Sequence, residues 1–308
     1  MTLTELRYIV AVARERHFGR AAEACHVSQP TLSVAIKKLE EELGSQIFER
    51  TSAEVALTAN GALIVQQAQR VLEEANALKH LAKHGQDPLV GPVRLGAIYT
   101  IGPYLLPSLV RVARETLPNT PLFLEENFTV RLLEMLRQGN LDCAVLADPF
   151  PSMGLDSIDL YDEPFLVAIP KGHPWAQLTE ISHAELKDQN TLLLGAGHCF
   201  RDHVLGVCPE LNRFAGNSMD GEQRNFEGSS LETIRQMVAG GIGITVLPRT
   251  SVPDPQTRDG LIRYLPFVAP IPTRRVRLVW RKSYPRVALM KILAQTIQAC
   301  QLPGVKVI

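Results

Sequence analysis

The sequence contains no run of apolar residues that approaches the roughly 18 to 20 needed for a membrane-spanning helix. Its first residues are charged from Glu5 onward and lack the apolar core of a signal peptide. The five cysteines include no C-x-x-C pair and no His/Cys cluster with metal-ligand spacing, which argues against a structural zinc site. We therefore expect a cytoplasmic protein that uses no metal or other cofactor and keeps its cysteines as thiols.

The sequence also lacks an excess of charge of either sign. Lys plus Arg and Asp plus Glu both total 32, so the charge of the whole chain argues neither for nor against a nucleic-acid partner. The 308 residues, 45% of them hydrophobic, are enough for two or three domains with their own cores. Local patterns must therefore identify the function.

The N-terminal segment has the periodicity of helices. Thr2 and Glu5 have the spacing of a capping box, and apolar residues then recur at helical intervals up to about Arg16. A second, short helix is expected around Gly19–His26. The first 85 residues are therefore predicted to be largely helical.

A third helix is predicted from Ser28, a good N-cap residue, to Leu43, with Gly44 as its C-terminal stop. Its expected buried stripe consists of Leu32, Ile36, Leu39 and Leu43. Its expected solvent-facing side consists of Gln29, Thr31, Ser33 and Lys37. Between Arg7 and Lys38 the net charge is +4. Two short helices joined by a tight turn, the second starting with amide and hydroxyl side chains, describe a DNA-binding helix-turn-helix or, alternatively, a plain three-helix packing unit.

Motifs along this segment resemble, in order, the N-terminal domain of LysR-type transcriptional regulators. They are Ala21-Ala22, Val27-Ser28-Gln29-Pro30-Thr31-Leu32-Ser33, Ile36-Lys37-Lys38-Leu39-Glu40, Leu43-Gly44, Ile47-Phe48-Glu49-Arg50 and Leu57-Thr58-Ala59-Asn60-Gly61. The resemblance implies a winged helix-turn-helix with its wing near 50–57. It implies DNA contacts by Ser28, Gln29, Pro30, Thr31, Ser33, Lys37 and Arg50.

After the wing, Thr58 is expected to cap a long linker helix. Its apolar residues Ile64, Ala68, Val71, Leu72, Ala75, Leu78 and Leu81 fall on one face, which a dimer would cover. Residues 85–88, Gly-Gln-Asp-Pro, end that helix and mark a hinge. The predicted domains are therefore 1–58 for DNA binding, 59–88 for the linker and 89–308 for regulation.

The remaining chain alternates strands and helices. The strand-like runs are Val93–Ile98, Leu122–Glu126, Leu141–Leu146, Phe165–Ile169, Leu192–Leu194, Thr245–Leu247 and Val276–Trp280. The helical patterns include Tyr104–Glu115, Thr129–Gln138 and Leu231–Ala239. This alternation predicts an α/β fold with largely parallel sheets. The family resemblance implies two α/β subdomains like those of periplasmic binding proteins, at 89–162 with 268–308 and at 163–267.

Cys199 and Cys208 stand out in this region. If the segment between them is helical, their Cα atoms lie roughly 13 Å apart, whereas a disulfide needs them within about 7 Å. Bond formation would therefore refold the segment, which makes the pair a candidate switch. Cys25, Cys143 and Cys300 are interpreted as inert core or surface thiols.

Further motifs resemble the peroxide-sensing OxyR branch of the LysR family. They are Gly197-His198-Cys199-Phe200-Arg201-Asp202 with Cys208, Gly96–Leu105, Glu125-Glu126-Asn127-Phe128-Thr129 and Ser229-Ser230-Leu231-Glu232-Thr233-Ile234. The resemblance makes Cys199 the thiol that hydrogen peroxide oxidises and Cys208 the resolving thiol. Two departures are His203, where many relatives have Gln, and a segment from Leu211 to Glu227 that is longer than usual.

The chemistry of the residues is consistent with these roles. Cys199 is expected at the start of a helix, beside His198 and two positions before Arg201, and each of these favours a thiolate. A more acidic thiol is also a weaker nucleophile, so rapid reaction needs groups that hold the peroxide and stabilise the departing hydroxide. The candidate donors are Thr100, Thr129, His198 and Arg201, although Thr129 also suits a simple helix N-cap.

The resemblance therefore implies a transcription factor rather than an enzyme. Its partners would be double-stranded promoter DNA, further copies of itself in a homodimer or homotetramer, RNA polymerase and hydrogen peroxide, with no membrane. One alternative is a regulator that senses a small carboxylate or other metabolite in the cleft between the subdomains, with incidental cysteines. Another is a thiol peroxidase, which would need turnover with a reductant.

Overall fold

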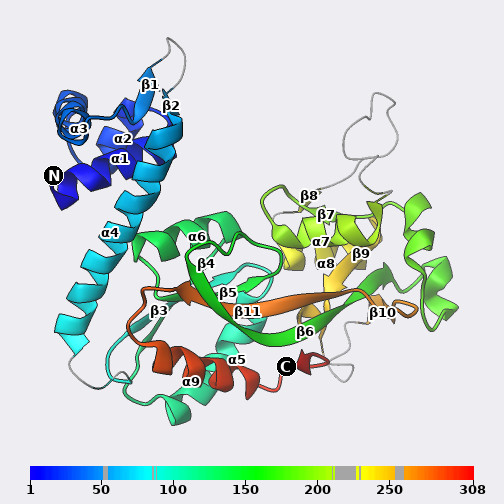
Figure 1. Ribbon diagram of the computed structural model, residues 1–308. Coiled ribbons are helices and arrows are strands. Elements are labelled where there is room, and N and C mark those ends of the chain that lie inside the picture. Colours follow the sequence, from blue (N-terminus) through cyan, green and yellow to red (C-terminus); the bar gives the residue numbers. More distant parts are fainter. Residues whose placement is uncertain are drawn as a thin grey trace. The chain divides into compact units, whose positions relative to one another are not determined.

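A computed structural model describes residues 1–50, 55–84, 87, 89–209, 211, 227–228, 230–253 and 260–308 (Figure 1). The chain forms two compact units, Met1–Gly85 with Arg137–Gly139, and Gln86–Leu136 with Asn140–Ile308. None of the described helices is long and apolar enough to cross a membrane.

The first unit begins with three helices, α1 (Leu3–Glu15), α2 (Phe18–Ala24) and α3 (Gln29–Leu43). The predicted capping box is confirmed, because the Thr2 hydroxyl accepts from the Glu5 amide and the Glu5 carboxylate accepts from the Thr2 amide. Ser28 caps α3, and Gly44 ends it with a left-handed φ of 62°. These local signals therefore set the helix boundaries.

The buried stripe of α3 was predicted correctly except at its end. Leu32, Ile36 and Leu39 are fully buried against the apolar residues of α1 and α2. Leu43 has the same helical phase but remains 40% exposed, because it lies in the last turn. Periodicity gives the direction in which a side chain points, whereas burial also needs a neighbouring element at that position.

The unit continues with a two-stranded antiparallel sheet and a long helix. Strands β1 (Phe48–Arg50) and β2 (Val55–Leu57) pair, and the segment 51–54 between them, in the predicted wing, lies outside the described residues. The Thr58 hydroxyl accepts from the Gly61 amide at the start of α4 (Ala59–His84), as a cap should. Of the predicted hinge at 85–88, only Asp87 is among the described residues.

The second unit contains an eight-stranded mixed sheet in the order β10-β6-β11-β5-β3-β4, with β9 and β12 also paired to β6. The strands are β3 (Val93–Ile98), β4 (Leu122–Asn127), β5 (Cys143–Ala147), β6 (Leu155–Pro170), β9 (Thr245–Pro248), β10 (Ile262–Pro266), β11 (Thr273–Arg281) and β12 (Lys306–Val307). A separate parallel pair consists of β7 (Leu193–Leu194) and β8 (Glu227–Gly228).

The expectation of largely parallel sheets was wrong. Only β3 pairs in parallel within the large sheet, with β4 and β5, whereas β6 is antiparallel to β9, β10, β11 and β12. The cause is the 16-residue strand β6, of which only Phe165–Ile169 was predicted. Its first half is only partly buried, so it lacks the continuous apolar run on which the prediction relied.

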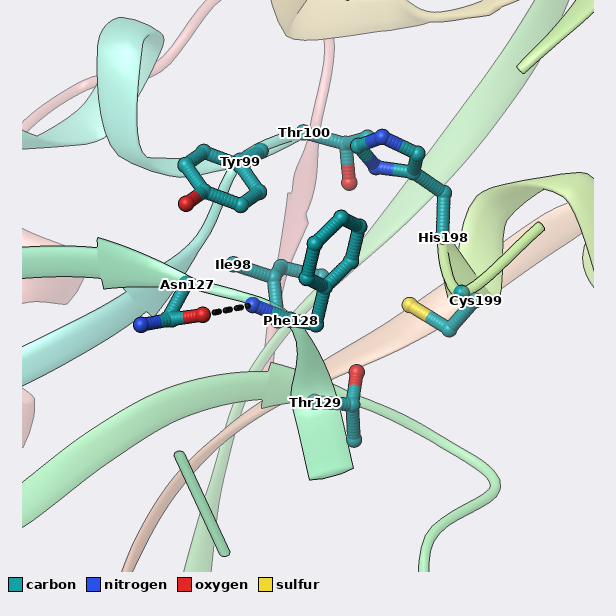
Figure 2. A pocket seen from close by; sticks show the side chains of 9 residues that line it. Ile98, Tyr99, Thr100, Asn127, Phe128, Thr129, His198 and Cys199 are labelled. Carbon is teal, nitrogen blue, oxygen red and sulfur yellow. Dashed lines mark hydrogen bonds between the residues drawn. The ribbon is translucent and has the colours of Figure 1, made fainter. Parts of the chain in front are cut away.

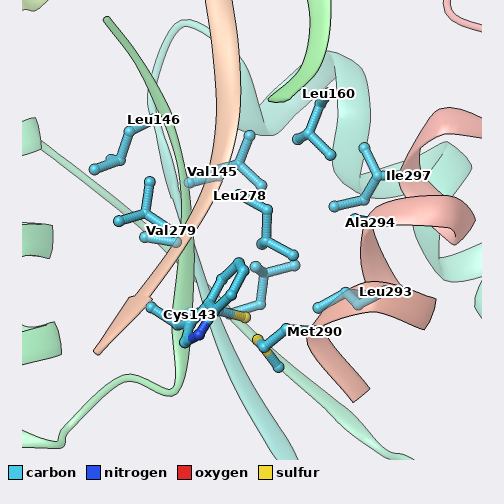
Figure 3. Packing of buried hydrophobic residues seen from close by; sticks show 14 of the residues in the cluster. Cys143, Val145, Leu146, Leu160, Leu278, Val279, Met290, Leu293, Ala294 and Ile297 are labelled. Carbon is cyan, nitrogen blue, oxygen red and sulfur yellow. The ribbon is translucent and has the colours of Figure 1, made fainter. Parts of the chain in front are cut away.

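Two apolar cores lie in this unit. The first gathers residues from 93–161 and 276–300, including α5 (Gly102–Thr116), α6 (Thr129–Gln138) and α9 (Val287–Gln298) (Figure 3). The second gathers residues from 165–267, including α7 (Cys199–Val207) and α8 (Leu231–Ala239). Strands β6 and β11 run side by side from one core toward the other (Figure 1). The ends of β3 and β4 and the start of α7 are therefore all held by packed elements.

Candidate functional site

The two cysteines of interest lie at opposite ends of α7. Cys199 is the first residue of this helix, and Cys208 is its C-cap, whose amide donates to the Val204 carbonyl. A rise of about 1.5 Å per residue places the two Cα atoms roughly 13 Å apart, and neither cysteine is in a disulfide. The predicted helix is thus confirmed, and a disulfide between its ends would require the helix to unwind.

The Cys208 end of α7 is packed into the second core. Cys208 is fully buried, and its thiol donates to the carbonyl of His183 across 3.4 Å. Five residues earlier, His203 Nε2 lies 2.5 Å from the carbonyl oxygen of Asp148, the residue that follows β5. Burial lowers the pKa of His203, which favours the neutral ring as a donor to that carbonyl. Cys208 therefore has to leave a packed environment before it can reach Cys199.

A small pocket surrounds the Cys199 thiol. It is lined by Ile98, Tyr99, Thr100, Asn127, Phe128, Thr129, Gly197, His198 and Cys199 (Figure 2). Its residues come from the end of β3, from the β4–α6 corner and from the start of α7. The cavity volume is about 10 Å³, close to the space that one water molecule needs. Three segments that are distant in the sequence thus enclose a thiol in a space for a very small molecule.

Thr129 contributes a hydroxyl to this pocket. It is the first residue of α6, and its Oγ1 is buried with no hydrogen-bond partner among the described residues. The alternative that Thr129 serves as a helix N-cap is therefore wrong, since its side chain accepts no backbone amide there. A buried hydroxyl without a partner lowers its free energy by bonding to a guest molecule.

Thr100 is fixed by a buried arginine that sequence reasoning missed. Arg274 donates from Nη1 to the Thr100 hydroxyl across 2.7 Å and from Nη2 to the Thr100 carbonyl across 2.9 Å. The Thr100 hydroxyl oxygen accepts from the Arg274 cation, so the hydroxyl hydrogen remains available to donate to a molecule in the pocket. The nearby positive charge also polarises the O–H bond, which makes it a stronger donor. Thr100 is 2% exposed, so this bond is shielded from water.

Arg274 is itself held by a fully buried carboxylate. Glu163 lies directly opposite it across the β6–β11 pair, and Glu163 Oε2 is 2.8 Å from both Nε and Nη2 of Arg274. The other oxygen, Oε1, accepts from the amide and the hydroxyl of Thr250. The Arg274 guanidinium also lies 5.1 Å from the centre of the Phe200 ring in α7. This network connects the pocket with the helix that carries both cysteines.

His198 and Arg201, the two basic candidates, lie in different surroundings. His198 precedes α7, lines the pocket and packs its ring against Phe128. Arg201 does not line it, because two helical residues rotate its direction by about 200° from that of Cys199. Its guanidinium donates to the Leu194 carbonyl across 3.0 Å and lines a second cavity. The site therefore gathers Thr100, Thr129, His198 and Cys199, and the expectation that Arg201 joins them is corrected.

The predicted DNA-contacting residues lie on or near α3. Ser28, Gln29, Pro30, Thr31 and Lys37 are exposed, whereas Ser33 is half-buried. The Ser28 hydroxyl is engaged in capping, since it accepts from the Thr31 amide, and Lys37 pairs with Glu41 across 3.8 Å. The side chain of Arg50 lies outside the described residues. Gln29 and Lys37 therefore remain available at the surface of the helix.

The other cysteines occupy unreactive positions. Cys143 and Cys300 are buried in the first core of the second unit, and Cys25 is partly buried beside the core of the first unit. Desolvation raises the pKa of all three thiols, that of Cys300 to about 11. They remain protonated at neutral pH, as expected for packing residues.

Comparisons with known families cover nearly the whole chain. Residues 3–62 match the bacterial regulatory helix-turn-helix protein of the lysR family, and residues 86–301 match the LysR substrate binding domain. The first match contains α1 to α3 and the second contains the pocket and α7.

Individual relatives are similar over the same length. The "DNA-binding transcriptional dual regulator OxyR" of Escherichia coli K12 is 44% identical over 299 residues, which are 97% of this chain and 95% of that protein. A full-length OxyR variant from Pseudomonas aeruginosa has a TM-score of 0.68 and 49% identity, over 98% of this chain and 99% of that one. An oxidised form of OxyR has a TM-score of 0.59 and 38% identity, over 70% of this chain and 97% of that one.

Proposed function

The chain belongs to the LysR family of bacterial transcriptional regulators, and from this premise we propose that it is a peroxide-responsive regulator with Cys199 and Cys208 as its redox switch. The Cys199 thiolate attacks one oxygen of hydrogen peroxide, the O–O bond breaks, and the departing hydroxide takes up a proton to become water. The Cys199 sulfenic acid then condenses with the Cys208 thiol, which forms a disulfide and releases a second water. One peroxide is reduced as two thiols are oxidised.

The observation that carries this proposal is the intact helix α7 between two cysteines that form no disulfide. One thiol faces a pocket of about one water volume, and the other is buried at the far end of the same helix. Two cysteines that only filled space would need neither a pocket beside one thiol nor a helix between the two thiols. Forming the disulfide would unwind Phe200–Val207 and remove Phe200 and Val204 from the second core. A chemical event at one sulfur thus becomes a change of fold.

The groups around Cys199 suit the proposed step. The Thr100 hydroxyl, oriented by Arg274, and the unpartnered Thr129 hydroxyl are donors for the peroxide and for the hydroxide as it leaves. His198 adds a ring nitrogen at the same pocket. These donors are buried, and a hydrogen bond from a buried donor to developing negative charge is worth more than the same bond in bulk water.

The output of the switch is proposed to be a changed arrangement of subunits on promoter DNA. Residues 1–58 would bind DNA, 59–88 would link and dimerise, and 89–308 would sense, with homodimer or homotetramer assembly and contact with RNA polymerase. The expectation that a dimer covers the apolar face of α4 is corrected in part, because Ile64, Ala68, Val71 and Leu72 pack on the core of the first unit in this chain. Further along the same face Leu78 is 68% exposed, so this part of α4 is the one left for association. Such a regulator acts in the cytoplasm and stores each oxidation as a disulfide rather than turning over as an enzyme.

The main alternative, a regulator that senses a carboxylate metabolite, would need a site other than the pocket at Cys199. A carboxylate metabolite has several heavy atoms, whereas that pocket has a volume of about 10 Å³. DNA footprinting of the reduced and the peroxide-treated protein tests the proposal. A changed footprint after oxidation is expected, and identical footprints would contradict it.

The exposed residues of α3 give a prediction about DNA recognition. Gln29→Ala is expected to weaken specific binding by about 1 to 3 kcal/mol and to relax one base position, because a base-edge contact is lost. Lys37→Ala should lower affinity evenly across sequences through the loss of a phosphate contact. Titration of both variants with specific and random DNA checks this. If the two variants affect both DNAs equally, the assignment of a base contact to Gln29 and a phosphate contact to Lys37 is wrong.

The buried thiol gives a second prediction. In Cys208→Ser, peroxide should leave Cys199 as a sulfenic acid that proceeds to sulfinic acid, because no partner captures it. Mass spectrometry of the treated variant identifies the product, with the wild type as control. A clean disulfide between Cys199 and another cysteine would remove Cys208 from the mechanism.

A further inference from the structure

Three aromatic rings form one side of the pocket at Cys199. Tyr99, Phe128 and His198, here called the aromatic wall, all contact one another edge to face (Figure 2). The ring centres are 5.2 Å apart for Tyr99 and Phe128, 4.8 Å for Phe128 and His198, and 5.9 Å for Tyr99 and His198. Such mutual contacts hold each ring in place more firmly than a single contact would.

The aromatic wall lies between solvent and the polar groups of the pocket. Tyr99 is 39% exposed and Phe128 is 38% exposed, whereas Thr100, Thr129 and His198 are all buried. Phe128 is also confined from its other side, because a Cβ on Gly197 would come within 3.4 Å of its ring. The two exposed rings thus form the outer boundary of a space whose reactive groups lie inside.

The volume inside this boundary restricts what can react. About 10 Å³ is the space of roughly one water molecule, so the alkyl group of a larger peroxide would have to lie against the rings of the aromatic wall. An alkyl hydroperoxide offers the same chemistry as hydrogen peroxide, since the thiolate attacks its terminal oxygen, the O–O bond breaks and an alkoxide leaves and is protonated to an alcohol. Discrimination between the two oxidants must therefore depend on their size, because the bond that breaks is the same in both.

We propose that the aromatic wall is a size filter that restricts Cys199 to hydrogen peroxide and excludes alkyl hydroperoxides, with Phe128 as the main specificity-determining residue. This inference rests on the proposed function of Cys199 as the peroxide-reactive thiol. Phe128 differs from the other two rings of the wall because its ring also lies close to Gly197, the residue before His198. It is also adjacent in sequence to Thr129, whose hydroxyl the incoming oxidant would meet.

The test compares two oxidants on one thiol. Second-order rates of Cys199 oxidation are measured by mass spectrometry with hydrogen peroxide and with tert-butyl hydroperoxide, in the full chain. Phe128→Ala should lower the preference for hydrogen peroxide by about tenfold or more, mainly through faster reaction with the alkyl hydroperoxide. Val130→Ala is the matched control, since this exposed side chain two residues away does not line the pocket and should leave both rates unchanged.

Other outcomes separate the possible failures. Equal changes of both rates in Phe128→Ala, or no change in either, would overturn the size filter. If that variant fails to fold, Phe128→Leu and the partly exposed Tyr99→Ala must shift the preference in the same direction, or the inference is rejected. A wild-type protein whose Cys199 does not react with hydrogen peroxide would instead overturn the proposed function.

Discussion

Replacing Cys199 with serine is expected to abolish the response to hydrogen peroxide while leaving DNA binding intact. The serine hydroxyl is not ionised at neutral pH and forms neither a sulfenic acid nor a disulfide, so the switch has no first step. The helix-turn-helix belongs to a separate compact unit with its own core, and it should fold and bind as before. Footprinting with and without peroxide measures both properties of the variant.

Matched controls for this variant are the remaining thiols. Cys25→Ser and Cys300→Ala should keep the full response, since Cys25 packs beside the first unit's core and the buried Cys300 does not line the pocket. Loss of the response in either control, or its survival in Cys199→Ser, would show that the wrong thiol had been chosen.

Replacing Glu163 with glutamine is expected to lower the free energy of unfolding by about 3 to 5 kcal/mol, because it leaves the Arg274 guanidinium buried without its counter-charge. The same change should slow the reaction of Cys199 with peroxide, since Arg274 also orients the Thr100 hydroxyl. Urea unfolding measures the first effect and the rate of thiol oxidation measures the second.

The control for this prediction is an exposed ion pair. Glu134→Gln breaks the contact with Arg131, whose atoms lie 3.0 Å apart at the surface, and should cost at most about 1 kcal/mol. Equal losses in the two variants would mean that the buried pair contributes no more than a surface pair. An unchanged rate of Cys199 oxidation in Glu163→Gln would show that Arg274 does not contribute to the reaction with peroxide.

Signals carried by neighbouring residues were sufficient for much of the fold. The bounds of Val93–Ile98, Thr129–Gln138 and Leu231–Ala239 agree with β3, α6 and α8, because an apolar pattern of the right kind lies within each segment. The motif at Gly197–Asp202, with Cys208, also identified α7 as the place of interest. Local pattern therefore predicted these elements and directed attention to Cys199.

The features that were missed depend on contacts between distant residues. Arg274 and Thr100 are 174 positions apart, and no local pattern links them. Glu163 belongs to a part of β6 that was not recognised as strand, so a charged residue facing the interior gave no signal. Arg201 was grouped with Cys199 by closeness in sequence, although the turn of the helix sends it to another cavity.

One equivalent of hydrogen peroxide should join Cys199 to Cys208 within a single chain, and peptide mapping detects this bond. Trypsin cleaves after Arg201, which separates the two cysteines into different peptides unless a disulfide joins them. After one equivalent of hydrogen peroxide, under non-reducing conditions, the account predicts these two peptides as one linked species that a reductant separates. A Cys199 sulfinic acid beside a free Cys208 thiol, or a link to any other cysteine, would contradict it.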